Sequence, residues 1–217
     1  RKGSLIKTRG PEIPCLIRWP KVIKPGSISN GLLQNTDFVP TWFELAGAKI
    51  PEDYHIDGKS LLPMFQDPSV SVRKFIYAEQ GAARAIKTDE WEYISLRYTD
   101  EQIASAQGNR SDRAFKTFLG LSGGISRAKD FHPGTFSADQ LYHLTHDPTS
   151  QKNLAGDQGY ARQLRKMKSM LTNTVKKLGP RPYGDFVPGK GTNDAATSQK
   201  ILDKLSVYHT TNGKKKK

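Results

Sequence analysis

The sequence predicts an α/β fold, in which the end of an α/β domain is followed by a small antiparallel sheet with a helix packed on it. Apolar runs of strand length occur beside segments whose apolar residues recur at helical spacing. Three short, strand-like runs also follow one another with turn residues between them, which is typical of antiparallel strands. At 217 residues and 24.2 kDa, the chain is long enough for one substantial core, or for a core and a small appendage.

The first two predicted elements are a buried strand and a helix. Residues 13–20 (IPCLIRWP) form a short apolar run whose length suits a buried strand, and Cys15 is then expected to be a small core residue. Apolar residues next recur at helical spacing in a segment that Thr36 or Asp37 can cap and that Gly47 ends. Because apolar residues occupy two faces of this helix, we expect it to lie deep against a sheet.

The remaining predicted elements complete a small sheet and its helices. In chain order they are a short helix within 56–65, strands over 73–79, 83–87, 92–98 and 140–144, and helices over 157–178 and 198–208. The Thr-Asp-Glu turn between the second and third of these strands predicts a hairpin. Residues 99–136 are rich in Gly, Ser, Asp and Arg, so we expect a long loop there with a short helix around 113–119.

The charge of the chain is unevenly distributed. Residues 161–217 hold 14 basic and three acidic residues, a net charge of +11, whereas residues 1–160 contribute only +2. Such an end either attracts a polyanion or is a solvated tail that keeps the protein in solution. No apolar run approaches the length of a membrane span. The single cysteine excludes an internal disulfide framework and a cysteine-built zinc site.

An ordered set of short motifs is more informative than periodicity. The motifs are KGSL (2–5), IPCLIRWP (13–20), KVIKPGSISN (21–30), TDFVPTWFELAG (36–47), IDGKSLLPM (56–64), RKFIYAE (73–79), WEYI (91–94) and LYHLTHDPTSQKNLA (141–155). Together they resemble the C-terminal portion of the sulfatase family of the alkaline phosphatase superfamily. The resemblance implies three parts: the end of an alkaline-phosphatase-like mixed sheet, a small antiparallel-sheet subdomain with its closing helix, and a basic, partly irregular tail. These parts are expected at 1–70, 71–180 and 181–217.

The resemblance implies that the intact protein hydrolyses sulfate esters of a carbohydrate or an aryl compound. The resemblance also implies a formylglycine made from the Cys or Ser of a Cys/Ser-x-Pro-x-Arg motif, a Ca²⁺ ion, and a secreted or periplasmic location. Cys15 is followed by Leu16, Ile17 and Arg18, which is not that motif. We therefore expect the nucleophile and the Ca²⁺ ligands upstream of this chain, and we expect the chain alone to be inactive.

Four residues are candidate site residues through the same resemblance. Lys2, in KGSL, occupies the position of a lysine that contacts the sulfate and supplies a fixed positive charge. The sequence after Lys2 departs from the usual family pattern, which makes Lys7 and Arg9 further candidates for contact with the substrate. His55, in a predicted loop, is the fourth candidate, also for substrate binding. No metal-ligating residue is assigned within the chain.

Two other functions stay open. A phosphodiesterase or phosphonate hydrolase of the same superfamily would share this C-terminal architecture. A polyanion-binding module would instead use the basic tail, including Lys214–Lys217, although no motif of the usual nucleic-acid-binding folds is present. The segment LYHLTHD is read as structural: on a strand, His143 and His146 point to opposite faces, and Asp147 then begins a turn, so convergent metal ligands are not expected.

Overall fold

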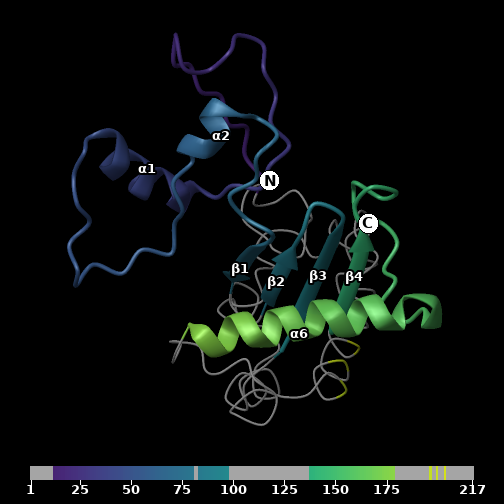
Figure 1. The fold of residues 1–217 in the computed structure, drawn as a ribbon. Coiled ribbons are helices and arrows are strands. Elements are labelled where there is room, and N and C mark those ends of the chain that lie inside the picture. The colour runs from purple at the N-terminus through teal and green to yellow at the C-terminus, as the bar shows by residue number, and fades with distance from the viewer. Residues whose placement is uncertain are drawn as a thin grey trace, which may run out of the picture. The chain divides into compact units, whose positions relative to one another are not determined.

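The computed structural model describes residues 12–80, 83–97 and 137–178, together with 196, 199 and 203. The chain divides into two compact units, one formed by Ile13–Ile76 and the other by Arg1–Glu12 with Tyr77–Lys217 (Figure 1). The predictions for 99–136 and for the tail beyond 180 lie almost entirely outside the described residues. The three-part division predicted from the sequence stays a prediction.

The second unit is built on a four-stranded sheet in the order β1-β2-β3-β4. The strands are β1 (Ile76–Gln80), β2 (Ala83–Lys87), β3 (Trp91–Leu96) and β4 (Asp139–His143). β2 pairs antiparallel with β3, and β3 pairs antiparallel with β4, so the predicted hairpin and the predicted fourth strand are confirmed. Strand neighbours in space are also neighbours in sequence, which is the simplest route to such a sheet.

A long helix, α6 (Ala161–Lys177), runs across this sheet (Figure 1). It follows a short 3₁₀ helix, η3 (Gln158–Tyr160), where the Asp157 carboxylate accepts a hydrogen bond from the backbone N of Gly159 at 2.9 Å. The buried side chains of α6, Met167, Leu171 and Val175, are four residues apart and so lie on one face. Full burial of each stabilises the unit by about 1.5–3 kcal/mol. The predicted helix over 157–178 is confirmed.

The strand register decides which side chains share a face of the sheet. Ile86 lies opposite Tyr93, and Tyr93 lies opposite Leu141, so these three share one face. Ala85, Ile94 and Tyr142 pack together on the other face, with Leu144 against them. These six residues, three on each face, are at most 5% exposed, so both faces of this small sheet are covered.

The unit Ile13–Ile76 holds a 3₁₀ turn and two short helices: η1 (Asn35–Asp37), α1 (Phe38–Leu45) and α2 (Leu62–Gln66). Its most buried residues are Asp37, Thr41, Leu61 and Met64. Both helices were predicted and are confirmed. None of the helices in the described part of the chain is long and apolar enough to cross a membrane.

Two sequence predictions for this unit are wrong. Residues 13–20 form no strand, Leu16 is 96% exposed, and Cys15 is an exposed free thiol and not a core residue. Helix α1 does not lie deep against a sheet, since Trp42 is 62% exposed. An extended segment becomes a strand only where a neighbouring backbone completes its hydrogen bonds, and the described residues of this unit offer none.

Candidate functional site

The structure describes one of the four predicted site residues. Lys2, Lys7 and Arg9 lie outside the described residues, so their roles stay predictions. The His55 side chain is 91% exposed, and its Nε2 lies 3.4 Å from Oδ1 of Asp57, which is itself 67% exposed. A solvated pair of this kind contributes little to stability. His55 is therefore open to solvent.

A polar cluster that the sequence did not reveal centres on Asp37. Its Oδ1 accepts from the backbone N of Lys59 at 2.8 Å, and its Oδ2 accepts from the backbone N of Gln34 at 2.7 Å. The guanidinium of Arg73 donates to both oxygens, with Nε 2.8 Å from Oδ2. Asp37 was predicted as a possible helix cap, but its side chain makes no cap hydrogen bond to α1. It completes a capping box with Gln34 at the start of η1 and joins this turn to two distant segments, through Lys59 and Arg73.

These contacts decide what Asp37 can do. Burial acts to raise the pKa of its carboxyl, but the hydrogen bond and charge of Arg73 and the two backbone donors outweigh it and hold the pKa below its usual value. Both carboxylate oxygens are already engaged. Asp37 is therefore a charged anchor at neutral pH, and its role in this unit is structural.

A close backbone approach completes the same cluster. A Cβ atom on Gly58 would lie 2.1 Å from the carbonyl oxygen of Thr36, which no side chain permits. The Arg73 Nη2 also donates to the carbonyl oxygen of Asp57 at 3.2 Å. The Ile-Asp-Gly-Lys-Ser motif is thus held against the start of α1 by a glycine contact and by Arg73. Its role in the described residues is structural, and it positions the loop that carries His55.

A second cluster joins β3, β4 and α6 through Asp139. Its Oδ1 accepts from the Tyr93 hydroxyl at 2.8 Å and from Arg97 Nη2 at 2.6 Å, and its Oδ2 pairs with Lys168. Burial acts to raise the pKa of Asp139, but the two cations lower it overall. The cluster fixes α6 to the sheet.

Glu92 on β3 is a buried acid with a perturbed pKa. It is 6% exposed, and burial raises its pKa to about 7. The Ser150 hydroxyl donates to its Oε2 at 3.3 Å and so ties the loop after β4 to the sheet. A raised carboxyl pKa is a common property of catalytic acids. Here, however, the side chain is enclosed in packing, so we read it as a structural contact.

The histidine pair in LYHLTHD is arranged differently from the prediction. The ring centroids of His143 and His146 are 4.4 Å apart, so the prediction of opposite faces is wrong. The strand ends at His143, and a turn closed by the hydrogen bond from His146 N to His143 O (3.1 Å) brings the second ring back. His143 also lies against Trp91, with centroids 4.2 Å apart.

The described residues do not fit the Ca²⁺ ion that the resemblance implies. Within 12–80, 83–97 and 137–178, no three His, Cys, Asp or Glu side chains converge closely enough to hold a metal. Asp147, beside the histidine pair, uses its two oxygens to accept from the backbone N atoms of Gln151 and Lys152, at 2.9 and 2.8 Å. The Asp147 carboxylate therefore stabilises the turn after β4.

The chain is similar in sequence to known sulfatases. Residues 5–103 match the family described as N-sulphoglucosamine sulphohydrolase, C-terminal. The chain is 32% identical over 184 residues to an ulvan-active sulfatase of Formosa agariphila, covering 80% of this chain and 35% of that protein. It is 27% identical over 170 residues to an N-acetylglucosamine-6-O-sulfatase of Bacteroides thetaiotaomicron, covering 76% of this chain and 25% of that protein.

A solved structure is also similar. It holds a protein in complex with its substrate, D-glucosamine-2-N,6-O-disulfate, and it matches with a TM-score of 0.51 and 25% sequence identity. The match covers 75% of this chain and 28% of that one. The chain therefore spans about a third or less of the length of each of these relatives.

Proposed function

We propose that this chain, which belongs to the sulfatase family and corresponds to its C-terminal portion, is part of a hydrolase that cleaves sulfate esters. The observation that carries the proposal is the 32% identity to a sulfatase across 80% of the chain. The likeness to the solved structure confirms the predicted α/β fold class. Since the chain spans only part of each relative, the activity is proposed for the intact protein and not for this portion alone.

The substrate we propose is a sulfated carbohydrate. One relative is named for N-acetylglucosamine 6-O-sulfate, and the similar solved structure is bound to a disulfated glucosamine. Both names refer to sulfate on a sugar, which supports a sugar sulfate as the substrate of the intact protein. A secreted or periplasmic location, where such polymers are met, is part of the same proposal.

In this proposal, the catalytic groups are divided between this chain and the part of the protein that it does not cover. The formylglycine nucleophile and the Ca²⁺ site are assigned to the part of the protein that this chain does not cover, because the described residues do not build such a site. Lys2 would place a positive charge on the sulfate, where negative charge lies on several oxygens. Lys7, Arg9 and His55 would contact the rest of the substrate.

The described clusters have a supporting role in this proposal. Asp37 and Arg73 hold the loop that carries His55, and Asp139 holds α6 on the sheet. A loop that contacts substrate must be positioned by a rigid scaffold if it is to contribute to specificity. The chain would therefore contribute substrate contacts and stability, and the rest of the protein would contribute bond cleavage.

Two measurements on the intact protein test the proposal. The coding sequence upstream of Arg1 should contain a Cys/Ser-x-Pro-x-Arg motif, and the purified protein should release sulfate from sugar sulfates. Absence of the motif together with no sulfate release would overturn the proposal. Faster release of phosphate than of sulfate would favour the phosphodiesterase or phosphonate hydrolase alternative. A polyanion-binding module would show neither activity, and its binding would be lost when Lys214–Lys217 are removed.

A further inference from the structure

Helix α6 presents five cations to the solvent along one face, three near its start and two at its end. We define the basic stripe as the exposed residues Arg162, Arg165, Lys166, Lys176 and Lys177. At 100° per residue, the five lie within an arc of about 120°, and they extend along about 22 Å of the helix. The exposed residues between them on this arc, Ser169 and Asn173, are uncharged and polar.

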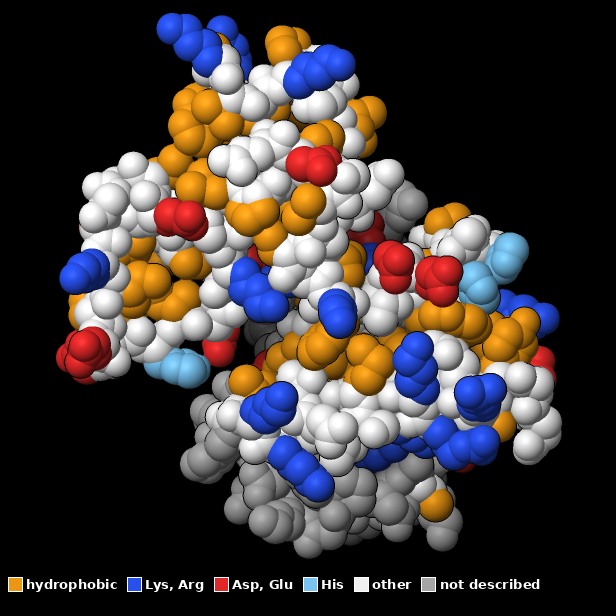
Figure 2. Space-filling model, in the orientation of Figure 1, with side chains coloured by type: hydrophobic (Ala, Val, Ile, Leu, Met, Phe, Trp, Pro, Cys, Tyr) orange, Lys and Arg blue, Asp and Glu red, His pale blue; other side chains and the backbone are white. Residues whose placement is uncertain are grey.

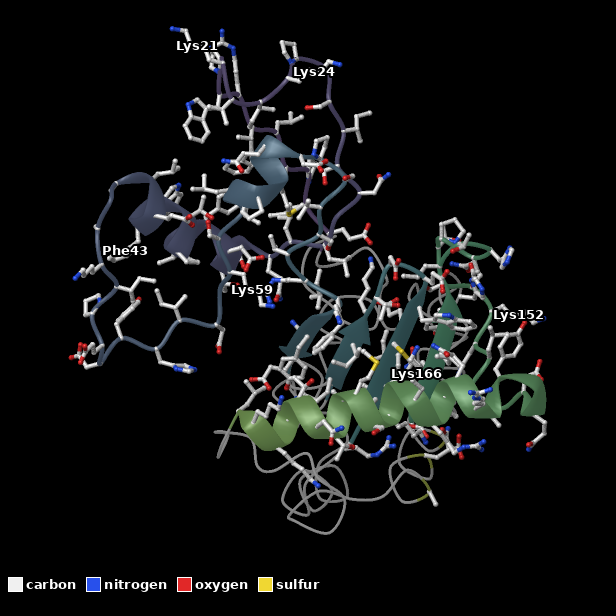
Figure 3. The ribbon with its side chains drawn as sticks, viewed as in Figure 1. Lys21, Lys24, Phe43, Lys59, Lys152 and Lys166 are labelled. Atoms are coloured by element: carbon white, nitrogen blue, oxygen red, sulfur yellow. The ribbon has the colours of Figure 1, made fainter. Side chains whose placement is uncertain are left out.

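The orientation of the stripe is fixed by the opposite face of the helix. Met167, Leu171 and Val175 are buried against the sheet and lie directly across the helix axis from the centre of the stripe. Lys168, at the edge of the buried face, pairs with Asp139. Figure 2 shows Lys and Arg side chains gathered over the face that α6 presents, and Figure 3 shows Lys166 projecting from the helix. The stripe therefore stays on the surface while the core is intact.

Three of the five charges of the stripe do not stabilise the helix that carries them, whereas Lys176 and Lys177 lie in its last turn, where the dipole favours cations. Helix α6 contains no acidic residue, so no pairs of opposite charge form along it. Arg162 has like-charged neighbours at i+3 and i+4, namely Arg165 and Lys166, and such pairs are destabilising. These three cations also lie in the first two turns, where the helix dipole disfavours positive charge. A helix face that is merely solvated usually carries charges of both signs, so this pattern indicates an anionic ligand.

We propose that the basic stripe binds a sulfated polysaccharide chain, which would make the substrate of the proposed function polymeric. This inference rests on the proposed function. Two groups of charges at the ends of a face about 22 Å long suit an extended polyanion, whereas one small anion would need charges that converge. The guanidinium groups of Arg162 and Arg165 can each donate two parallel hydrogen bonds to sulfate oxygens, as they do to phosphate. Ser169 and Asn173 can hydrogen-bond to sugar hydroxyls.

The composition of the stripe favours a polysaccharide over other polyanions. Single-stranded nucleic acids are held by aromatic side chains on which bases stack, and the stripe has none. A helix that lies in a membrane surface buries an apolar face in the lipid, but the apolar face of α6 is already buried in the protein. A sulfated polysaccharide requires only exposed cations and polar groups.

The test measures binding of dextran sulfate, with uncharged dextran as the reference, to the intact protein at rising NaCl concentrations. The first variant combines Arg162→Gln, Arg165→Gln and Lys166→Gln. The matched control combines Lys21→Gln, Lys24→Gln and Lys49→Gln, which removes the same charge from exposed lysines of the other unit. We expect the stripe variant to bind about tenfold more weakly and with a shallower salt dependence, and the control to change by less than about twofold. Equal losses in the two variants would overturn the inference.

Two further arms separate the stripe from other sources of binding. A variant with Lys214–Lys217 changed to Gln should keep most of its affinity, and a loss confined to that variant would contradict the inference. Duplex DNA and phosphatidylserine vesicles should bind more weakly than dextran sulfate, and a preference for either would overturn it. Hydrolysis of a small sugar sulfate by the unaltered protein is measured separately. Failure there would contradict the proposed function, whereas the binding arms decide whether the stripe recognises sulfated polymers.

Discussion

The guanidinium of Arg73 donates hydrogen bonds to the carboxylate of Asp37, which lies 36 residues earlier in the chain, with Nε 2.8 Å from Oδ2. Asp37 is fully buried and the Arg73 side chain is 11% exposed, so the pair lies inside the unit Ile13–Ile76. This unit has few buried apolar residues. A charged pair with backbone donors on both carboxylate oxygens therefore supplies much of what fixes its loops to α1.

Removing one partner of this pair should strongly destabilise the unit Ile13–Ile76. We expect Asp37→Ala to lower the free energy of unfolding of its unit by about 3–5 kcal/mol, because Arg73 is left buried without its counter-charge. Urea denaturation monitored by the tryptophan fluorescence of that unit measures the change. Asp53→Ala removes an exposed carboxylate from the same unit and should change stability by less than about 0.5 kcal/mol. A loss below about 1 kcal/mol in Asp37→Ala would contradict the structural role of the pair.

Glu92 should make stability depend on pH. The pKa of Glu92 in the folded protein, about 7, lies above the ordinary value of 4.5. Its contribution to the free energy of unfolding is therefore fully present below about pH 4.5 and is lost as the pH rises through 7. The loss is roughly 3 kcal/mol at most. Glu92→Gln should therefore become more stable relative to the unaltered protein as the pH rises from about 4.5 to 8.

Chemical denaturation at a series of pH values checks this prediction. Glu90→Gln is the matched control, since Glu90 is exposed two residues earlier in the chain. Its stability relative to the unaltered protein should be nearly constant with pH. If Glu92→Gln gave the same flat difference, the carboxyl would not be titrating in the folded state with a raised pKa.

Gly58 should not tolerate a side chain. A Cβ atom there would meet the backbone oxygen of Thr36 at 2.1 Å, and the backbone must shift to relieve the clash. We expect Gly58→Ala to destabilise the unit by about 1–3 kcal/mol or more. In Gly156→Ala the added Cβ meets nothing within 4 Å, so this variant should be nearly neutral. Equal melting temperatures for the two variants would argue against the close approach.

Lys2 should act on the reaction and not on the fold. If it places a positive charge on the sulfate, Lys2→Ala in the intact protein should lower kcat/KM about 10²–10³-fold, as loss of one stabilising group at a reacting oxyanion does. The circular dichroism spectrum and melting temperature should be unchanged. Lys24→Ala, at an exposed lysine, is the control. A change of less than about twofold for Lys2→Ala would remove Lys2 from the site.

Local patterns predicted most of the strands and the long helix that the structure describes in the second unit. The hairpin of β2 and β3 follows from two strand-like runs with a turn between them, and α6 follows from apolar residues at helical spacing before a helix stop. Both signals lie within a few residues of one another in the chain. They therefore need no knowledge of distant contacts.

Contacts between distant residues were not predictable. The pairing of Asp37 with Arg73 leaves no local signal, because 36 residues separate the partners. Residues 13–20 have the composition of a buried strand, but composition does not state which backbone would pair with them. The approach of His143 to His146 depends on a turn that the strand pattern does not specify. The roles of Lys2, Lys7, Arg9 and His55 depend on the family resemblance alone.

The most direct test of the account compares two substrates that differ only in the transferred group. The intact protein is assayed with N-acetylglucosamine 6-sulfate and with N-acetylglucosamine 6-phosphate, and kcat/KM is measured for release of each anion. We expect the sulfate to be preferred by about 10²-fold or more, because a site built for one group binds its transition state selectively. Equal rates, or a preference for the phosphate, would contradict the proposal that the protein is a sulfatase.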